Sequence, residues 1–357
     1  MVRRALLFAA TLLPTTLLAQ QPSMTFGGFV DTYVAWDSGR PLNLDRQYTT
    51  QAARHAEFNL NLGFIDAILA GDRIRGRIAL QAGTSVQVAY ANEPTNGAIS
   101  GPSLARNIQE AVVGVRVNKN AWVDAGIFLS HLGSESWVSR DNPTYTRSLI
   151  RDFSPYYESG AKLTWKLRPD FTALVTIVNG WGNISENNAD KSAGVRLDWQ
   201  ISPHISLGYY NLVGNEQPDT LVAKMRFYNG MTARWASHEY TIVATLDGGR
   251  QDAPLAADSW WGASLIARAQ TTEHTAFTAR GEMFQDPKQV IVLTGVTPGF
   301  RAYGGSMGFD FEPTDGVVWR TEYRALKGQD AIFLDRGSAS GLNKTNVLFV
   351  TSLAVTF

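Results

Sequence analysis

The chain contains no cysteine among its 357 residues. This excludes a disulfide framework, a thiolate metal site and a cysteine nucleophile. An excess of one charge is also missing, because 32 Lys and Arg balance 32 Asp and Glu. Proteins that bind nucleic acid neutralise phosphates with clustered basic side chains, and this chain has no basic block. Nucleic acid is therefore not an expected partner.

Long apolar runs are absent beyond the first 20 positions. A transmembrane helix needs a run of about 18 apolar residues, so helical membrane spans are excluded. Charged residues nevertheless make up only 18% of the chain, against roughly 25% in a typical soluble domain. Glycine and aromatic residues are abundant instead, with 32 Gly, 17 Phe, 12 Tyr and 10 Trp. This composition favours alternating strands over helices.

Residues 1–19 have the layout of a secretory signal peptide. A basic start at Arg3 and Arg4 precedes an apolar stretch and a small-residue end at Ala19; the alternative is a buried N-terminal helix. Removing this segment leaves 30 basic and 32 acidic residues in residues 20–357, a net charge of −2. The sequence therefore predicts an exported protein with one mature domain. The lack of cysteine suits an oxidising compartment.

A period of two dominates the chain after this segment. In residues 73–90, for example, Ile74 and Ile78 belong to one parity, and Arg75 and Arg77 belong to the other. Successive side chains of a strand point to opposite faces, so each such segment has one apolar and one polar face. Sixteen segments follow this pattern, at residues 24–36, 54–66, 73–90, 106–118, 121–132, 156–167, 170–181, 192–202, 204–214, 222–234, 238–249, 259–270, 275–285, 303–312, 317–327 and 345–357.

The connections between these segments alternate in length. Seven are short turns, as at residues 119–120 and 202–203, and eight are long loops, as at residues 37–53 and 133–155. This alternation is typical of an even-stranded barrel with short periplasmic turns, longer external loops and both termini on one side. Closure is also the only arrangement of strands that pairs every backbone polar group within lipid. We therefore predict a closed antiparallel transmembrane β-barrel of sixteen strands, with fourteen or eighteen as alternatives.

The inward parity of the predicted strands is strongly charged. Sixteen strands enclose an aqueous channel, whereas about eight would be filled by their own side chains. Burying these charges without water would cost several kcal/mol per ion, so we expect a wet lumen. The charged positions are Arg75, Arg77, Arg116, Asp124, Lys162, Arg196, Arg280, Glu282, Asp310, Arg320, Glu322 and Arg324.

Aromatic residues mark two features of the outer parity. Four tryptophans each lie within about four residues of a short turn, as expected of a girdle where the ring meets lipid and the N–H meets water. Unrelated core tryptophans are the alternative. The chain also ends on an apolar alternation that closes with Phe357, and this resembles the C-terminal strand by which outer-membrane proteins are recognised for assembly. The four tryptophans are Trp165, Trp199, Trp235 and Trp319.

Short motifs, most of them between residues 107 and 158, carry a resemblance to a known family. They are Ile108-Gln109-Glu110-Ala111, Trp122-Val123-Asp124-Ala125-Gly126-Ile127-Phe128, Ser130-His131-x-Gly133-x-Glu135-Ser136, Tyr145-Thr146-Arg147-Ser148, Ser154-Pro155-Tyr156-Tyr157-Glu158, Asn179-Gly180-Trp181 and Phe26-Gly27-Gly28-Phe29-Val30-Asp31. On these motifs the sequence resembles the OmpL-like family of outer-membrane β-barrel porins over nearly the whole mature chain. The resemblance implies an outer-membrane pore and supplies no established binding or catalytic residue.

The third long loop, residues 133–155, is the longest connection. General porins that resemble this layout fold their third external loop into the channel and narrow it. Our hypothesis is that the charges of this loop face charges of the inner wall across a constriction and select solutes by charge; the alternative is a solvated surface loop. Arg outnumbers Lys 24 to 8, a weak indication of anion preference. The predicted pore-lining residues are Arg77, Gln81, Arg116, Arg140, Asp141, Arg147, Arg151, Asp152, Glu158, Lys162, Arg280, Glu282, Glu322 and Arg324.

Motifs for catalysis or metal binding are few. Ser130 and His131 lie at the external end of the fifth predicted strand, but adjacent residues of a strand point to opposite faces and cannot act as nucleophile and base. Oxygen ligands at residues 186–190 could hold Ca²⁺, although a solvated turn explains them more simply. We therefore expect no enzyme activity, no metal and no cofactor, and a hydrolase mounted on the barrel is the least favoured alternative.

The sequence as a whole predicts an outer-membrane porin through which small hydrophilic solutes diffuse passively. A structural or adhesive barrel without an open pore is the main alternative. The expected partners are outer-membrane lipid, the barrel-assembly machinery and the solutes themselves, and a homo-oligomer is left open.

Overall fold

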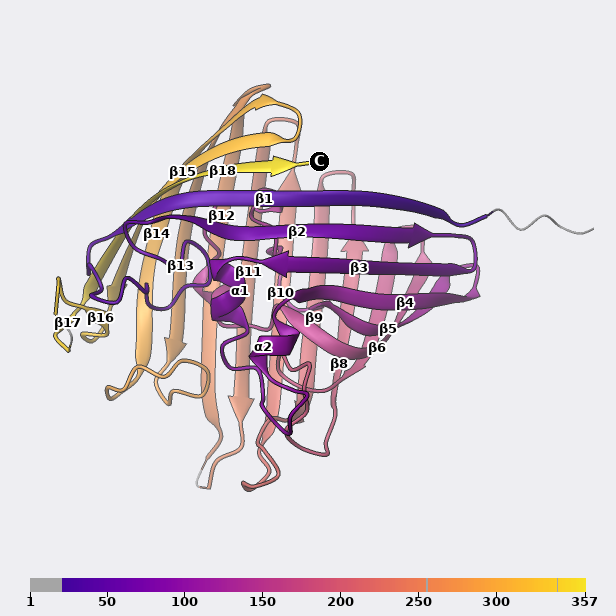
Figure 1. Ribbon diagram of the computed structural model, residues 1–357, viewed down its shortest axis with the longest axis horizontal. Helices are drawn as coiled ribbons and strands as arrows, with labels where there is room; N and C mark the ends of the chain where they lie inside the picture. Colours follow the sequence, from indigo (N-terminus) through magenta and orange to yellow (C-terminus); the bar gives the residue numbers. More distant parts are fainter. Residues whose placement is uncertain (1–20, 255, 339) are drawn as a thin grey trace, which may run out of the picture.

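The computed structural model describes residues 21–254, 256–338 and 340–357. The predicted signal peptide, residues 1–19, lies outside the described residues. Within the described ranges the chain forms a closed barrel and a small two-stranded sheet in the last long loop (Figure 1). No helix in these ranges is long and apolar enough to cross a membrane.

Sixteen antiparallel strands close the barrel, which confirms the predicted fold class. Strands that follow one another around the barrel pair as neighbours, and β1 closes against β18 from Phe29↔Thr356 to Asp37↔Leu348. The strands are β1 (Ser23–Asp37), β2 (Phe58–Ala70), β3 (Ile74–Ala82), β4 (Ile108–Asn118), β5 (Ala121–Leu129), β6 (Tyr157–Arg168), β7 (Phe171–Val178), β8 (Ser192–Gln200), β9 (Ile205–Asn215), β10 (Met225–Ala236), β11 (Tyr240–Gln251), β12 (Asp258–Thr272), β13 (Thr275–Asp286), β14 (Phe300–Thr314), β15 (Val317–Gly328) and β18 (Thr345–Thr356). The small sheet pairs β16 (Phe333–Leu334) with β17 (Leu342–Asn343).

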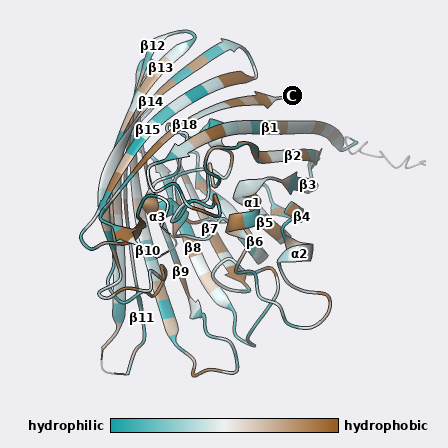
Figure 2. Cartoon of the chain, turned by 60° about the vertical axis from the view of Figure 1, so that its left-hand side comes forward, coloured by the Kyte–Doolittle hydropathy of each residue, from teal (hydrophilic) through white to brown (hydrophobic). Residues whose placement is uncertain are grey.

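The outward parity of the strands is apolar and exposed. Met231, Leu265 and Met307, on three different strands, are 61%, 55% and 71% exposed. Hydrophobic and hydrophilic residues alternate along β12–β15 (Figure 2). An apolar band of this kind is the surface that a barrel presents to lipid.

The predicted strand at residues 73–90 is wrong beyond Ala82. β3 ends there, and the helix α1 (Thr84–Ala89) follows. Gly83 has a φ of 140°, and a Cβ at this position would lie 2.2 Å from the carbonyl oxygen of Asn61. Only glycine accommodates this turn. The helix α2 (Pro102–Ala105) lies in the same long loop.

The alternation predicted for residues 54–66 is also interrupted in β2, so residues of one parity do not all lie on the same face. The register of β1 and β2 shifts between Asp31 and Thr32, and such a bulge moves the following side chains to the other face. Leu62 is therefore 1% exposed and packs in a buried cluster with Phe29. Phe58, which has the same parity and lies on the other side of the bulge, is 90% exposed.

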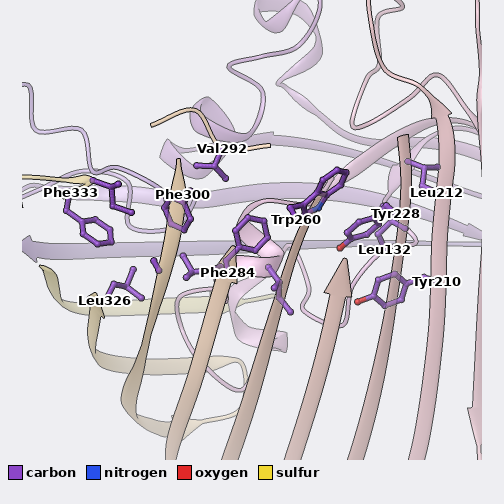
Figure 3. Close-up of a cluster of buried hydrophobic side chains, with 14 of the residues drawn as sticks. Leu132, Tyr210, Leu212, Tyr228, Trp260, Phe284, Val292, Phe300, Leu326 and Phe333 are labelled. Atoms are coloured by element: carbon purple, nitrogen blue, oxygen red, sulfur yellow. The ribbon is translucent and has the colours of Figure 1, made fainter. Parts of the chain in front are cut away.

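The lumen contains a dry apolar core at the loop end of the barrel (Figure 3). Tyr210, Tyr228 and Trp260 on the inner wall are at most 2% exposed. Leu149, at the start of the helix α3 (Leu149–Asp152), packs in the same cluster. The expectation of a wet lumen is therefore wrong for this part of the interior, because loops fold inward and cover the wall.

Candidate pore and its constriction

Loop 3 (residues 130–156), which joins β5 to β6, folds into the barrel. Thr146, Arg147 and Leu149 are 0% exposed. The 3-10 turn η1 (Ser139–Asp141) within the loop lies against β1, where the hydroxyl of Ser139 donates a 2.7 Å hydrogen bond to Asp31. This burial does not fit a solvated surface loop.

Five charged side chains of β13 and β15 hold loop 3, and we call them the clasp. They are Arg280, Glu282, Arg320, Glu322 and Arg324, and none is more than 6% exposed. Arg280 donates to the hydroxyls of Thr144 at 2.9 Å and Thr146 at 2.8 Å. Glu322 accepts from the backbone N–H of Thr146 at 2.7 Å.

The other members of the clasp complete the network. Glu282 accepts from Arg324 at 2.8 Å and from the backbone N–H of Leu149 at 2.8 Å. Arg320 donates to three backbone carbonyls of loop 3, those of Ser139, Asn142 and Pro143. These charges contact one another and the loop backbone; Arg280 Nε makes no hydrogen bond among the described residues, and it lies 3.2 Å from the Glu282 carboxylate. Arg280, Glu282, Glu322 and Arg324, predicted to line the pore, hold loop 3 instead.

Arg147 is also placed differently from its predicted position. Its guanidinium lies 4.7 Å from the ring centroid of Trp137 and 4.5 Å from that of Tyr156. It donates to the carbonyl of Ser136 at 3.1 Å and to the hydroxyl of Thr50 at 2.8 Å. Arg147 therefore fastens loop 3 internally and to the first long loop, and it does not face open water.

Charges of β2–β6 form a second group on the inner wall, which we call the hydrated wall. The Arg75 side chain is 38% exposed although it pairs with Asp124 at 2.5 Å. Arg77, 24% exposed, pairs with Asp66 at 2.7 Å and with Glu110 at 3.1 Å. The full group is Asp66, Arg75, Arg77, Glu110, Arg116, Asp124 and Lys162; its arginines reach solvent, whereas Asp124 and Glu110 are only 3% and 9% exposed.

Three other predicted pore-lining residues lie on this side of the barrel, and they differ in their exposure to solvent. Arg116 is exposed, with its guanidinium 4.9 Å from the ring centroid of Trp122, and Lys162 is half-buried. Gln81 is buried and accepts a 2.9 Å hydrogen bond from the indole of Trp137. Gln81 is therefore an anchor of loop 3 rather than part of the hydrated wall.

Two cavities lie on either side of loop 3. The loop-side cavity, about 470 Å³, is bordered by the long loops and by Asp152. The turn-side cavity, about 660 Å³, reaches the short turns at Asp170 and contains Arg140 and Asp141 of loop 3. The two cavities share no lining residue.

Arg151 lies in the partition between these cavities. Its guanidinium donates to the hydroxyl of Ser154 at 3.1 Å and to the carbonyl of Pro155 at 2.5 Å, and both residues line the loop-side cavity. It also donates to the carbonyl of Glu135 at 2.9 Å. Glu135 follows Ser134, which lines the turn-side cavity. One buried side chain therefore joins the lining of the loop-side cavity to a residue adjacent in sequence to the lining of the turn-side cavity.

Ser130 and His131 at the root of loop 3 both bind Glu158. The hydroxyl of Ser130 donates to Glu158 at 2.8 Å, and Nδ1 of His131 lies 2.9 Å from the same carboxylate. Nε2 of His131 lies 2.8 Å from the carbonyl oxygen of Asn211. Both ring nitrogens face acceptors, an arrangement that favours the protonated ring and opposes a role as a base for Ser130. Glu158, predicted to line the pore, is 0% exposed.

The outer surface carries the predicted interface residues. Trp165, Trp199, Trp235 and Trp319 are between 41% and 47% exposed, and the indole of Trp199 donates to Asp170 in a short turn at 3.1 Å. Phe357 is 68% exposed, and its backbone pairs with Gly28 of β1. Among the described residues, no group of three or more His, Asp and Glu side chains is arranged to hold a metal ion.

Comparison with known proteins agrees with this geometry. Residues 23–357 match the model of the family described as Putative beta-barrel porin-2, OmpL-like. The chain belongs to this family. The resemblance predicted from short motifs is therefore confirmed over nearly the full length of this OmpL-like porin. No curated protein sequence matches it.

Solved structures of outer-membrane proteins share the fold of this OmpL-like porin at low sequence identity. An anion-selective porin from Comamonas acidovorans superimposes with a TM-score of 0.62 at 12% identity, covering 94% of this chain and 100% of that one. The outer membrane channel DcaP of Acinetobacter baumannii gives 0.62 and 12%, covering 94% and 98%. OmpT of Vibrio cholerae gives 0.61 and 9%, covering 96% and 99%.

Proposed function

We propose that the protein is a bacterial outer-membrane porin through which small hydrophilic solutes diffuse passively. The observation that carries this proposal is a closed sixteen-stranded barrel entered from each end by a cavity, with loop 3 as the partition. The family membership supports the same function. No step of such transport needs a cofactor or a covalent intermediate, and the contacts of both His131 ring nitrogens with acceptors argue against a hydrolase.

The constriction lies at Arg151 in this proposal. Water and solutes pass from the loop-side cavity to the turn-side cavity where the Arg151 side chain now joins Ser154 to Glu135. Small movements of this side chain set the width of the path. The turn-side cavity is lined by five arginines and five carboxylates, so we expect weak charge selectivity.

The surroundings of the barrel follow from its outer surface. The apolar band lies in lipid, the four tryptophans lie at the turn-side interface, and Phe357 is the terminal signal for the barrel-assembly machinery. An assembly of several copies is compatible with the fold, since one solved relative of the fold, OmpT of Vibrio cholerae, is described in a trimer form.

Single-channel recording in planar bilayers tests the proposal. The unmodified protein should give stepwise currents in KCl, and Arg151→Ala should give larger steps because the partition loses its connecting side chain. Arg250→Ala, which removes an exposed arginine at the loop end of β11, is the matched control and should leave the step size unchanged. Absence of current from both the unmodified protein and Arg151→Ala would favour a structural barrel instead.

A further inference from the structure

The loop-side cavity differs in chemistry from the turn-side cavity. Its volume of about 470 Å³ falls in the range of small-molecule sites. The rings of Tyr48, Phe153 and Trp181 are half-buried on its lining, whereas the turn-side cavity carries ten charged side chains. This contrast indicates that the entrance recognises an uncharged surface.

The three rings are fixed by contacts behind them. Tyr48 and Phe153 pack edge-on against Phe300 of the barrel wall, with ring centroids 5.0 and 5.1 Å apart. Trp181 packs perpendicular to Tyr228 at 4.9 Å. A ring held in place in this way loses little conformational entropy when a ligand packs against it.

The two charged side chains on the cavity lining already have ion-pair or hydrogen-bond partners within the protein. Arg46 pairs with Asp37 at 2.9 Å and is only 3% exposed. Asp152 accepts from the hydroxyls of Thr50 and Tyr156 through one oxygen, and its other oxygen is buried without a partner. The carboxylate of Asp152 on the lining opposes an anionic ligand.

Neutral hydrogen-bonding groups complete the cavity. Asn92 is exposed and Asn183 is half-buried, and both line the cavity. Neither side chain makes a hydrogen bond to any other part of the chain that the structure describes. An amide offers both a donor and an acceptor, which matches the hydroxyl groups of a polyol.

We propose that the loop-side cavity binds a neutral ring-shaped polyol of the sugar class. One apolar face of the ring packs on the fixed aromatic side chains, and its hydroxyls bind Asn92 and Asn183. The site deepens the proposed porin function, on which its role in transport rests, because it concentrates one class of solute before the constriction at Arg151.

Two assays on the purified full chain test this proposal. In detergent, glucose and maltose are titrated while tryptophan fluorescence is recorded, with benzoate as an anionic ring for comparison. In planar bilayers, maltose is added to the side of the long loops during KCl conduction. We expect saturable binding and saturable block by maltose, and no comparable effect of benzoate.

Single substitutions test whether maltose binds in the loop-side cavity. Trp181→Ala should weaken maltose binding roughly threefold to tenfold, the effect of losing one aromatic contact. Asn183→Ala tests the hydrogen bonds without removing a ring. Trp261→Ala, which removes a 45% exposed ring from the outer face, is the control and should leave maltose binding unchanged.

The outcomes separate the two proposals. KCl currents with neither maltose block nor maltose binding would overturn the sugar site and leave the porin function standing. Block by benzoate but not by maltose would overturn it as well. If KCl currents are absent, the porin function falls, and the fluorescence titration alone decides whether the cavity binds sugar.

Discussion

The two sides of the inner wall carry similar charges in different surroundings. In the clasp, Arg280 and Glu282 pair at 3.2 Å and both side chains are 0% exposed. On the hydrated wall, Arg75 pairs with Asp124 at a shorter distance and remains 38% exposed. The difference is loop 3, whose backbone lies against the clasp. Where loop 3 covers the wall, the inward-facing charges are buried against the loop, and of the five clasp residues only Arg320 also lines one of the two cavities.

Breaking the clasp should give the largest effect. Arg280→Ala removes the buried partner of Glu282 and Glu322, and losing one partner of a buried ion pair costs about 3–5 kcal/mol. We expect the free energy of unfolding to fall by this amount in urea titrations of the protein in lipid vesicles.

The hydrated wall supplies the matched control. Arg116 is exposed and has no carboxylate within 4 Å among the described residues. Arg116→Ala should therefore change the free energy of unfolding by no more than about 0.5 kcal/mol. Equal losses in Arg280→Ala and Arg116→Ala would contradict the division into clasp and hydrated wall.

A smaller, pH-dependent effect is expected at the root of loop 3. Burial alone would lower the pKa of His131, but the Glu158 carboxylate and the Asn211 carbonyl outweigh burial and raise that pKa above its usual value. The folded state thus binds the proton more tightly than the unfolded state. The stabilisation is complete below about pH 6.5 and is lost as the pH rises through the raised pKa.

Unfolding of the unmodified protein and of His131→Gln over this pH range measures the effect. The difference between their free energies of unfolding should shrink as the pH rises. A constant difference would show that His131 does not hold loop 3 through its charge. Arg196 donates to the carbonyls of His131 and Gly133, and its positive charge opposes the rise in the pKa of His131.

The smallest effect should appear in ion selectivity. Arg234→Glu reverses one exposed charge in the lining of the turn-side cavity and should lower the permeability of chloride relative to potassium, as measured by reversal potentials in a KCl gradient. Salt screening limits the shift. Arg250→Glu, at the loop end of β11, is the control, and a larger shift in that variant would place the ion path elsewhere.

The number and closure of the strands could be predicted from the sequence because the period of two is a local signal. β10–β15 follow the predicted segments closely. The signal failed at Gly83, where residues of α1 happen to continue the alternation of β3. It failed again in β2, because a bulge reverses the parity without changing the composition.

The candidate site was less predictable. The inward parity identified the clasp residues, yet Thr146 and Glu322, which hydrogen-bond to each other, are 176 positions apart. No local pattern shows that the third loop covers one wall and leaves the other wet. Arg151 was named as a charge of the constriction, but its contacts with backbone carbonyls carry no signal in the sequence. The loop-side cavity, formed by several distant loops, was missed entirely.

Chemical accessibility of neighbouring positions on one strand tests the central claim most directly. The chain has no cysteine, so Thr232→Cys and Met231→Cys each introduce a unique thiol on β10. Thr232 lines the turn-side cavity and Met231 is exposed on the outer face. In proteoliposomes, a charged water-soluble thiol reagent should modify Thr232→Cys rapidly and Met231→Cys very slowly. Equal modification of both, or faster modification of Met231→Cys, would contradict a barrel with a wet lumen and a lipid-facing exterior.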